Sequence, residues 1–280
     1  MNEPASRYLV VDDIRTHYWE VGEGPTLVLL HAGGYGENAE RSWHRNFAAL
    51  ASEHRVVAPD WLGFGKTEKI RDFGRGHARM LDHLVRFLEV MDVGEADFVG
   101  LSMGGTFLLK AMATGVPVLP VRRLVLVSSG GFSPLNEARR ILQDYDGTME
   151  AMRAQLQQVF HEPLWADDDF VRPYWEASLQ PGQWESVSSP SLRAPFAPPR
   201  GDFGNTDDTP YEQITVPTLL TAGAQDKLRE PGYAPAIGQR IARCEVIVYD
   251  PCGHCPNVER ADEWNDAVLD WLRRTPVNGA

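Results

Sequence analysis

The sequence predicts an α/β fold, in which a mostly parallel sheet is covered by helices on both faces. Two observations carry this prediction. Short apolar runs that are typical of strands buried on both faces alternate with amphipathic stretches that have helical spacing. In addition, the chain has 280 residues, of which 43% are hydrophobic, and this is enough for the core of one large α/β domain.

The predicted strands begin with a hairpin at residues 7–11 and 14–20, followed by a continuous apolar run at 26–31. The remaining predicted strands are residues 55–60, 96–101, 123–129, 216–222 and 245–250. Helices are expected at residues 42–51, 77–91, 106–114 and 259–274. In the second and fourth of these helices, the apolar residues repeat every three or four positions, as they do on the buried face of a helix.

One long segment interrupts the alternation of strands and helices. Residues 131–210 contain helical pieces at 136–158 and 166–179 but no convincing buried strand. We interpret 131–210 as a helical lid that excludes water and shapes a substrate cavity, with 1–130 and 211–280 as the two parts of the core domain. The alternative is an extra helical layer, and we expect only two or three of the segment's aromatic residues to face substrate. These aromatic residues are Phe160, Trp165, Tyr174, Trp175, Trp184 and Phe196.

The composition argues against several classes of partner. The formal net charge of -12 disfavours binding to nucleic acid or to an anionic membrane. We find no secretory signal, and no apolar run approaches the roughly 20 residues of a membrane helix. The three cysteines do not suggest a disulfide framework. We therefore expect a cytoplasmic protein that acts on a small molecule and uses neither cofactor nor metal, and the choice between monomer and homodimer stays open.

The most informative motif is Gly100-Leu101-Ser102-Met103-Gly104, a Gly-x-Ser-x-Gly sequence between a predicted strand and a predicted helix. In that context the serine lies on a sharp, strained turn at the end of the sheet. Glycines two residues on either side are needed because a side chain there would collide with the neighbouring strand and helix. The motif therefore predicts that Ser102 is a nucleophile.

A serine hydroxyl needs a base, and the base needs a carboxylate that orients it. His254 lies on the loop after the last predicted strand, and Asp226 directly follows the strand at 216–222. Both are therefore expected at the carboxyl edge of the sheet, in the chain order Ser, Asp, His that this arrangement requires. Asp250 is the nearest competitor for the role of Asp226.

Acyl chemistry also needs hydrogen-bond donors for the developing oxyanion. The backbone N–H of Met103, at the start of a helix, is one predicted donor. The second is expected from the small-residue loop after residue 31, and we favour Gly33. His31 is predicted to hold this loop rather than to act as a second base, and Trp61 and Phe64 are weaker candidates for the cavity wall.

These motifs together resemble the α/β-hydrolase superfamily over nearly the whole chain. Within it, the sequence is most similar to the meta-cleavage-product hydrolases, which cleave carbon–carbon bonds in products of aromatic ring opening. The resemblance rests on HAGGYG (31–36) followed by SWHRNFAAL (42–50), on SMGG (102–105), and on CGHCPNVERADEWN (252–265). It implies the α/β-hydrolase fold, with eight strands and a lid after the sixth. It also implies a triad of Ser102, Asp226 and His254, with Gly33 and Met103 at the oxyanion.

Three departures from that family concern the substrate. Leu101 stands where the family usually has Asn, Cys255 where it usually has Trp, and Tyr174 where it usually has an Arg before a lid Trp. We therefore expect a mostly apolar cavity that prefers a neutral substrate over a charged dienoate, with Arg172 as the residue that could reverse this preference. The predicted substrate-binding residues are Gly34, Leu101, Arg172, Tyr174, Trp175, Trp184 and Cys255.

The predicted function is that of a serine hydrolase acting on a small, mostly apolar carbonyl compound. The scissile bond is a carbon–carbon bond of a diketone-like or ring-cleavage product, or an ester or lactone bond, and a general carboxylesterase is an alternative. A slow ligand-binding receptor of the same fold is another. The pair Cys252 and Cys255 also fits a redox or zinc motif, but it lacks the thioredoxin-like surroundings or the second ligand pair that those functions need.

Overall fold

In the part of the chain that the structure describes, residues 3–189 and 207–276 of a computed structural model, eight strands form one sheet in the order β1-β2-β4-β3-β5-β6-β7-β8. Strand β1 pairs antiparallel with β2, and β2 pairs antiparallel with β4, whereas every later pairing is parallel. The strands are β1 (Ala5–Val11), β2 (Ile14–Val21), β3 (Thr26–Leu30), β4 (Arg55–Pro59), β5 (Ala96–Leu101), β6 (Val121–Val127), β7 (Thr218–Gly223) and β8 (Cys244–Tyr249). This arrangement confirms the predicted α/β fold with a mostly parallel sheet.

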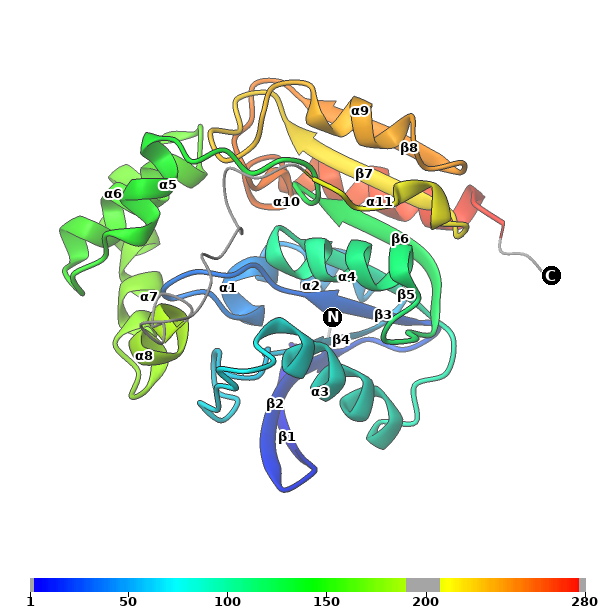
Figure 1. Ribbon diagram of the computed structural model, residues 1–280, viewed down its shortest axis with the longest axis horizontal. Coiled ribbons are helices and arrows are strands. Elements are labelled where there is room, and N and C mark those ends of the chain that lie inside the picture. The colour runs from blue at the N-terminus through cyan, green and yellow to red at the C-terminus, as the bar shows by residue number, and fades with distance from the viewer. Residues whose placement is uncertain (1–2, 190–206, 277–280) are drawn as a thin grey trace.

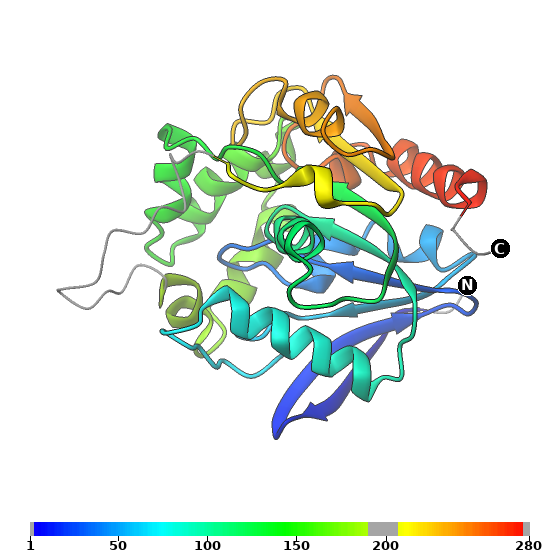
Figure 2. The ribbon, with the colours of Figure 1, turned by 45° about the vertical axis from the view of Figure 1, so that its right-hand side comes forward.

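Helices cover both faces of the sheet, and each face has its own apolar layer (Figures 1 and 2). One layer includes side chains of α3 (His77–Val90), α4 (Met103–Thr114) and α9 (Tyr233–Gly238). The other includes side chains of α1 (Ala39–Trp43), α2 (Phe47–Leu50), α10 (Pro256–Glu259) and α11 (Ala261–Arg274). Because strands such as β3 and β5 are buried along almost their whole length, they read as continuous apolar runs in the sequence.

Two predicted helices are each divided in the structure. The expected helix at 42–51 is replaced by α1 and α2, and Asn46 lies between them with its side-chain amide donating to Asn257 O (2.9 Å). The expected helix at 136–158 is replaced by α5 (Glu137–Gln143) and α6 (Met149–Val159). Gly147 adopts a positive φ of 86° between them, and the side chain of Thr148 then caps α6. Helix α9 was not predicted, because six residues are too few for a periodic pattern.

In its described part, the segment between β6 and β7 carries four α-helices beyond the carboxyl ends of these strands, at the left of Figure 1. They are α5, α6, α7 (Asp168–Ser178) and α8 (Gln183–Ser188), with a short 3-10 helix at Pro163–Ala166. A second 3-10 helix, Tyr211–Gln213, precedes β7. Phe196, one of the predicted lid aromatics, lies outside the described residues.

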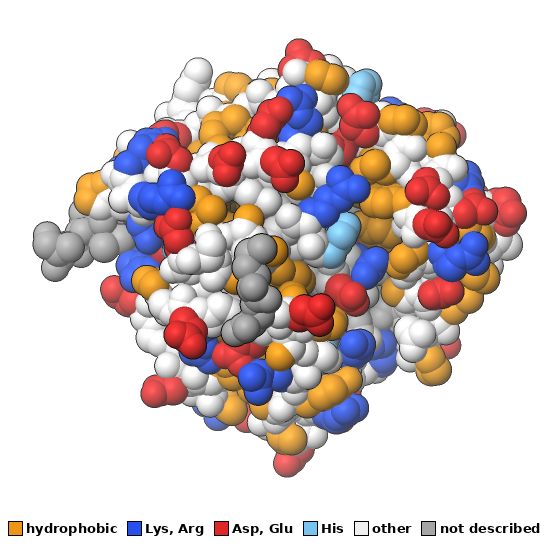
Figure 3. Space-filling view, turned by 180° about the vertical axis from the view of Figure 1, so that it is seen from behind, with side chains coloured by type: hydrophobic (Ala, Val, Ile, Leu, Met, Phe, Trp, Pro, Cys, Tyr) orange, Lys and Arg blue, Asp and Glu red, His pale blue; other side chains and the backbone are white. Residues whose placement is uncertain are grey.

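The surface carries charges of both signs. On the face seen in Figure 3, Lys and Arg side chains are interspersed with Asp and Glu side chains. None of the described helices combines the length and the apolar character needed to cross a bilayer.

A buried ion cluster joins the beginnings of two central strands. Asp97, whose side chain has no exposed surface, accepts hydrogen bonds from Arg122 (2.6 and 3.1 Å) and from Arg123 (2.6 and 2.8 Å). Burial alone would raise the pKa of Asp97, but the hydrogen bonds from Arg123 and Arg122 outweigh it and hold that pKa below its ordinary value. Arg123 also donates to Thr275 O (3.1 Å), so the cluster ties the end of α11 to the sheet.

Replacing Asp97 should therefore destabilise the fold. We expect Asp97→Asn to lower the free energy of unfolding by about 3 kcal/mol, because two guanidinium groups lose their buried counter-ion. Urea unfolding monitored by tryptophan fluorescence measures this change. Asp270→Asn, which removes an exposed partner of Arg274, is the matched control and should change stability by no more than about 0.5 kcal/mol. Equal effects of the two variants would contradict a structural role for the Asp97 cluster.

Candidate active site

The turn between β5 and α4 brings the sheet and the helix into very close contact. A Cβ atom at Gly100 would lie 2.4 Å from the Cα atom of Gly105, so neither position accepts a side chain without movement of the backbone. Between these glycines Ser102 adopts a φ of 51°, and its N–H donates to Val127 O (2.8 Å). A positive φ is strained for a non-glycine residue, and such strain is concentrated at functional sites. The strand and helix on either side of the motif are those expected from the sequence.

The structure brings the three predicted triad residues together. His254 Nε2 lies 2.8 Å from Ser102 Oγ, and His254 Nδ1 lies 2.7 Å from Asp226 Oδ2. Ser102 follows β5, Asp226 follows β7 and His254 follows β8, so parallel strands deliver all three side chains to one edge of the sheet. Asp250, the competing carboxylate, instead accepts a hydrogen bond from Gln225 Nε2 (2.8 Å) at an exposed position.

The electrostatic surroundings keep Asp226 ionised. Burial raises the pKa of this carboxyl, but the charge and hydrogen bond of His254, together with the charge of Arg229, more than offset the burial and lower the pKa. The backbone N–H of Leu228 also donates to Asp226 Oδ1 (2.8 Å). An ionised carboxylate at this position can fix the orientation of the imidazole and stabilise its protonated form.

The loop of His254 is held by the inserted helices. His254 N–H donates to Val159 O (2.7 Å), at the end of α6. The Glu259 carboxylate accepts from the N–H groups of Gly253 (2.9 Å), His161 (2.8 Å) and Glu162 (2.8 Å). A single half-buried carboxylate therefore fastens the segment after α6 to the loop that carries the histidine.

The two residues predicted to donate to the oxyanion lie close together, Gly33 beside the side chain of Met103. A Cβ atom at Gly33 would lie 2.6 Å from Met103 Sδ, so the bare glycine backbone passes directly beside the start of α4. The first N–H groups of a helix have no partner within the helix, and they favour negative charge. Nearby, His31 donates from Nδ1 to Ala32 O (2.6 Å) and accepts at Nε2 from Trp61 N (2.9 Å). Burial lowers the pKa of His31 to about 4, so the ring is neutral and holds the loop.

A cavity of about 420 Å³ opens over Ser102. Of the predicted substrate-binding residues, Gly34, Tyr174 and Cys255 line it, as do Gly33 and Met103. Phe64 also lines the cavity, whereas Trp61 is part of the core beneath it.

Four predicted substrate-binding residues do not line this cavity. Leu101 packs in the core and is 1% exposed. Arg172 points to solvent from α7, because the turn of that helix that directs Tyr174 inward directs Arg172 outward. Trp175 donates to Gly147 O (2.9 Å) within the insertion, and Trp184 is 47% exposed.

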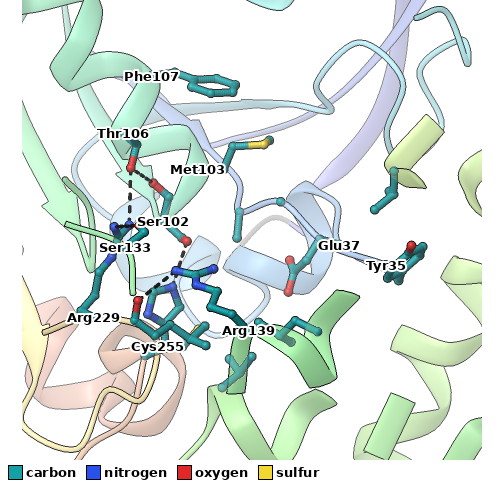
Figure 4. A pocket seen from close by; sticks show the side chains of 18 of the residues that line it. Tyr35, Glu37, Ser102, Met103, Thr106, Phe107, Ser133, Arg139, Arg229 and Cys255 are labelled. Atoms are coloured by element: carbon teal, nitrogen blue, oxygen red, sulfur yellow. Dashed lines mark hydrogen bonds between the residues drawn. The ribbon is translucent and has the colours of Figure 1, made fainter. Parts of the chain in front are cut away.

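The cavity wall combines a larger apolar part with several charged side chains. Six charged side chains from separate parts of the chain line the cavity: Glu37, Arg71, Lys110, Arg139, Asp207 and Arg229. Figure 4 shows Arg229 beside Ser102 and Glu37 on the other side of the view. Arg229 lies only three residues after Asp226 in the sequence, so the predicted position of Asp226 could have placed Arg229 at the site as well. Arg139 had no such signal, because its helix belongs to the insertion.

The two cysteines near His254 have the surroundings of structural thiols. Cys252 and Cys255 are both buried, and burial raises the pKa of each thiol well above its ordinary value. A raised pKa disfavours the reactive thiolate. Across residues 3–189 and 207–276, no group of three or more His, Cys, Asp or Glu side chains is placed to hold a metal ion.

Comparison with known proteins places this geometry in context. Residues 27–267 match the model of the Alpha/beta hydrolase family. The chain is 30% identical to 2-hydroxymuconate semialdehyde hydrolase of Pseudomonas sp. (strain CF600), over 97% of each chain. It is 28% identical to 2-hydroxy-6-oxo-2,4-heptadienoate hydrolase of Pseudomonas putida F1, over 97% of this chain and 98% of that protein.

A solved structure is also similar. It is a mutant of the meta-cleavage product hydrolase CumD from Pseudomonas fluorescens IP01, complexed with acetates. The two share 26% identity with a TM-score of 0.84, over 95% of this chain and 97% of that one.

Glu37 has an unusual environment in the cavity wall. Burial raises the pKa of its carboxyl to about 7, although the Ser42 hydroxyl donates to Glu37 Oε2 (2.8 Å) and Arg41 lies near. The folded protein therefore retains this proton up to about pH 7, whereas the unfolded chain loses it near pH 4.5. The contribution of Glu37 to stability is full below about pH 4.5 and is lost as the pH rises toward 7.

Replacing Glu37 with Gln should remove this pH dependence. We expect the stability of Glu37→Gln relative to the wild type to increase by about 1–3 kcal/mol between pH 5 and pH 8, because the variant has no buried group to ionise. Urea unfolding at both pH values measures the difference. Glu150→Gln, at an exposed position on α6, is the control and should show no such change. A pH-independent difference for Glu37→Gln would contradict the assigned proton.

Proposed function

Since this chain belongs to the α/β-hydrolase family, we propose that it is a serine hydrolase in which Ser102 is the nucleophile, His254 the general base and Asp226 the carboxylate that orients the base. The observation that carries this proposal is the continuous chain of hydrogen bonds from Ser102 through His254 to Asp226, at 2.8 and 2.7 Å. Nucleophile and base lie within direct proton-transfer distance, and the base is held by a third group.

The geometry supports a two-step reaction. Ser102 Oγ attacks the substrate carbonyl carbon while His254 Nε2 takes the hydroxyl proton, and the N–H groups of Gly33 and Met103 stabilise the resulting oxyanion. The bond to the leaving group then breaks, and His254 gives its proton to the leaving carbon or oxygen. This leaves an acyl group on Ser102. Water, deprotonated by His254, attacks this ester, so that the acid is released and the Ser102 hydroxyl is restored.

We propose that the scissile bond is the carbon–carbon bond next to a ketone or aldehyde carbonyl in a ring-cleavage product. The relatives that cover nearly the whole chain are named for hydrolysis of 2-hydroxymuconate semialdehyde and of 2-hydroxy-6-oxo-2,4-heptadienoate. The same nucleophile, base and oxyanion donors also serve esters and lactones, so these compounds are the alternative substrates.

We further propose that residues 131–210 form a lid on a core made of 1–130 and 211–280. Tyr174 and Arg139 of this segment line the cavity, and Val159 O accepts the backbone N–H of His254. A helical layer that only packed on the sheet would not be expected to contact the loop of His254 or to line the cavity. These contacts favour a segment that closes the cavity over Ser102.

The triad assignment predicts distinct losses in three variants. Ser102→Ala should abolish both turnover and labelling by a fluorophosphonate probe, and His254→Ala should lower kcat by at least ~10³. Asp226→Asn should lower kcat by about 10²–10⁴, because a neutral amide favours the wrong imidazole tautomer. Asp250→Asn is the control and should keep most of the activity. If the fluorophosphonate labelled Ser102→Ala to the same extent as the wild type, the assignment of Ser102 as nucleophile would be disproved.

The bond class is tested with a panel of substrates. We expect kcat/KM for a 2-hydroxy-6-oxo-dienoate to exceed that for p-nitrophenyl acetate and for a simple lactone by at least about tenfold, as measured by loss of dienoate absorbance and by release of p-nitrophenol. Activity confined to the ester would leave Ser102 as the nucleophile and assign the protein as a carboxylesterase instead.

A further inference from the structure

Arg229 is a buried cation beside the nucleophile, and its hydrogen bonds go to neutral oxygens. The residue is 6% exposed. Its Nη1 donates to Ser133 Oγ (2.8 Å), and its Nε and Nη2 donate to Ser128 O (3.2 and 3.1 Å). Its Nη2 also lies 3.5 Å from Thr106 Oγ1, which in turn donates to Ser102 O.

The charge of Arg229 is not neutralised by direct contact with a carboxylate. Among residues 3–189 and 207–276, no carboxylate oxygen lies within 4.0 Å of its guanidinium nitrogens. Asp226 senses the positive charge, which lowers its pKa, but the hydrogen bond of Asp226 goes to His254. A buried charge without a close counter-ion is costly, so an anion that enters the cavity gains from meeting Arg229.

Arg139 brings a second guanidinium to the same place from a different part of the chain. It lies on α5 of the insertion, lines the same cavity and donates from Nη2 to Leu228 O (2.9 Å), one residue before Arg229. Burial, and then the charge of Arg229, lower the pKa of Arg139 to about 10. The positive charge of Arg229 disfavours a second positive charge on Arg139, and an anion that contacts both guanidinium groups would offset this repulsion.

The side of the cavity around Glu37 differs in charge from the side around Arg229. In Figure 4, Arg229 and Ser133 lie on one side of Ser102, and Glu37 and Tyr35 lie on the other. Tyr35 is hydrogen-bonded to Ser188 (2.9 Å), and the Glu37 carboxyl accepts from Ser42 (2.8 Å). A negatively charged substrate group is therefore attracted toward the cation Arg229, whereas the protonated Glu37 carboxyl offers it no positive charge, and this difference sets the direction in which the substrate lies across Ser102.

From these observations we infer that Arg229 and Arg139, with Ser133 beside them, form the binding site for a carboxylate of the substrate. The inference rests on the proposed function, because it assigns a substrate group to the cavity over Ser102. Guanidinium groups bind carboxylates through two parallel N–H bonds, and they remain charged at all physiological pH values. In this proposal, Arg229 and Arg139 bind the substrate carboxylate that the neutral Tyr174 cannot bind. The proposed preference is therefore for acids, whereas the sequence led us to expect a preference for uncharged substrates.

The test compares a ring-cleavage dienoate with its methyl ester in each variant. We expect wild-type kcat/KM to favour the free acid by tenfold or more. Arg229→Gln and Arg139→Gln should each reduce the acid-to-ester ratio by about tenfold to a hundredfold, mainly through KM for the acid. Arg140→Gln is the matched control, since Arg140 is the next residue on α5, is largely exposed and pairs with Glu137 (3.2 Å). Its ratio should equal that of the wild type.

The acid-to-ester ratio of kcat/KM also distinguishes two roles of Arg229: binding of the substrate carboxylate and electrostatic support of Asp226. If Arg229 acts only through Asp226, then Arg229→Gln should slow acid and ester equally, and the unchanged ratio would overturn the inference. A wild-type preference for the methyl ester would overturn it as well.

A second measurement keeps the inference independent of the bond that is cleaved. Benzoate and the neutral benzamide are compared as competitive inhibitors of p-nitrophenyl acetate hydrolysis. We expect benzoate to bind at least tenfold more tightly than benzamide to the wild type and to Arg140→Gln, but not to Arg229→Gln or Arg139→Gln. If the dienoate is not hydrolysed but benzoate shows this pattern, the proposed bond class fails and the carboxylate site stands. Equal binding of benzoate and benzamide to the wild type would show that no carboxylate site exists.

Discussion

The close approach of β5 to the start of α4 is the constraint on which the site depends. Because Gly100 and Gly105 meet without room for a side chain, the chain must reverse sharply between them, and Ser102 takes up the strained conformation. The same packing presses Gly104 against the end of β3, where a Cβ atom would lie 2.5 Å from Leu30 O. Met103 is thereby held beside Gly33. One packing contact thus fixes the proposed nucleophile and brings Gly33 close to Met103, the two residues proposed to donate to the oxyanion.

Charge is distributed unevenly around this turn. Asp226 is engaged by His254, and Arg229 stands behind it with only neutral hydrogen-bond acceptors. Glu37 faces the cavity from the loop after β3 and holds its proton near neutral pH because it is buried. The apolar layers on the two faces of the sheet provide stability. The few ionisable groups at its carboxyl edge make the two sides of the cavity differ in charge.

The core could be predicted from the sequence because its strands are buried on both faces and therefore read as uninterrupted apolar runs. The triad positions could be predicted because parallel strands bring their carboxyl ends to one edge, so Asp226 and His254 needed only to follow the right strands. The cavity wall contributed by the insertion could not be predicted in the same way. On α7 the inward side chain is Tyr174 rather than its neighbours Arg172 and Trp175, and this depends on how the helix is rotated against the core. No local pattern encodes that rotation.

The contacts of Glu259 bear on how this architecture can diversify. Its carboxylate holds the histidine loop and the chain after α6 at the same time. Asn136, which caps α5, and Arg139 within α5 donate to the carbonyls of Lys227 and Leu228. The insertion is therefore not an interchangeable module on a constant core. A chimaera that received another protein's insertion would lose the partners of both catalytic loops, and it would work only if the matching residues around 227–229 and 253–259 were transplanted with it.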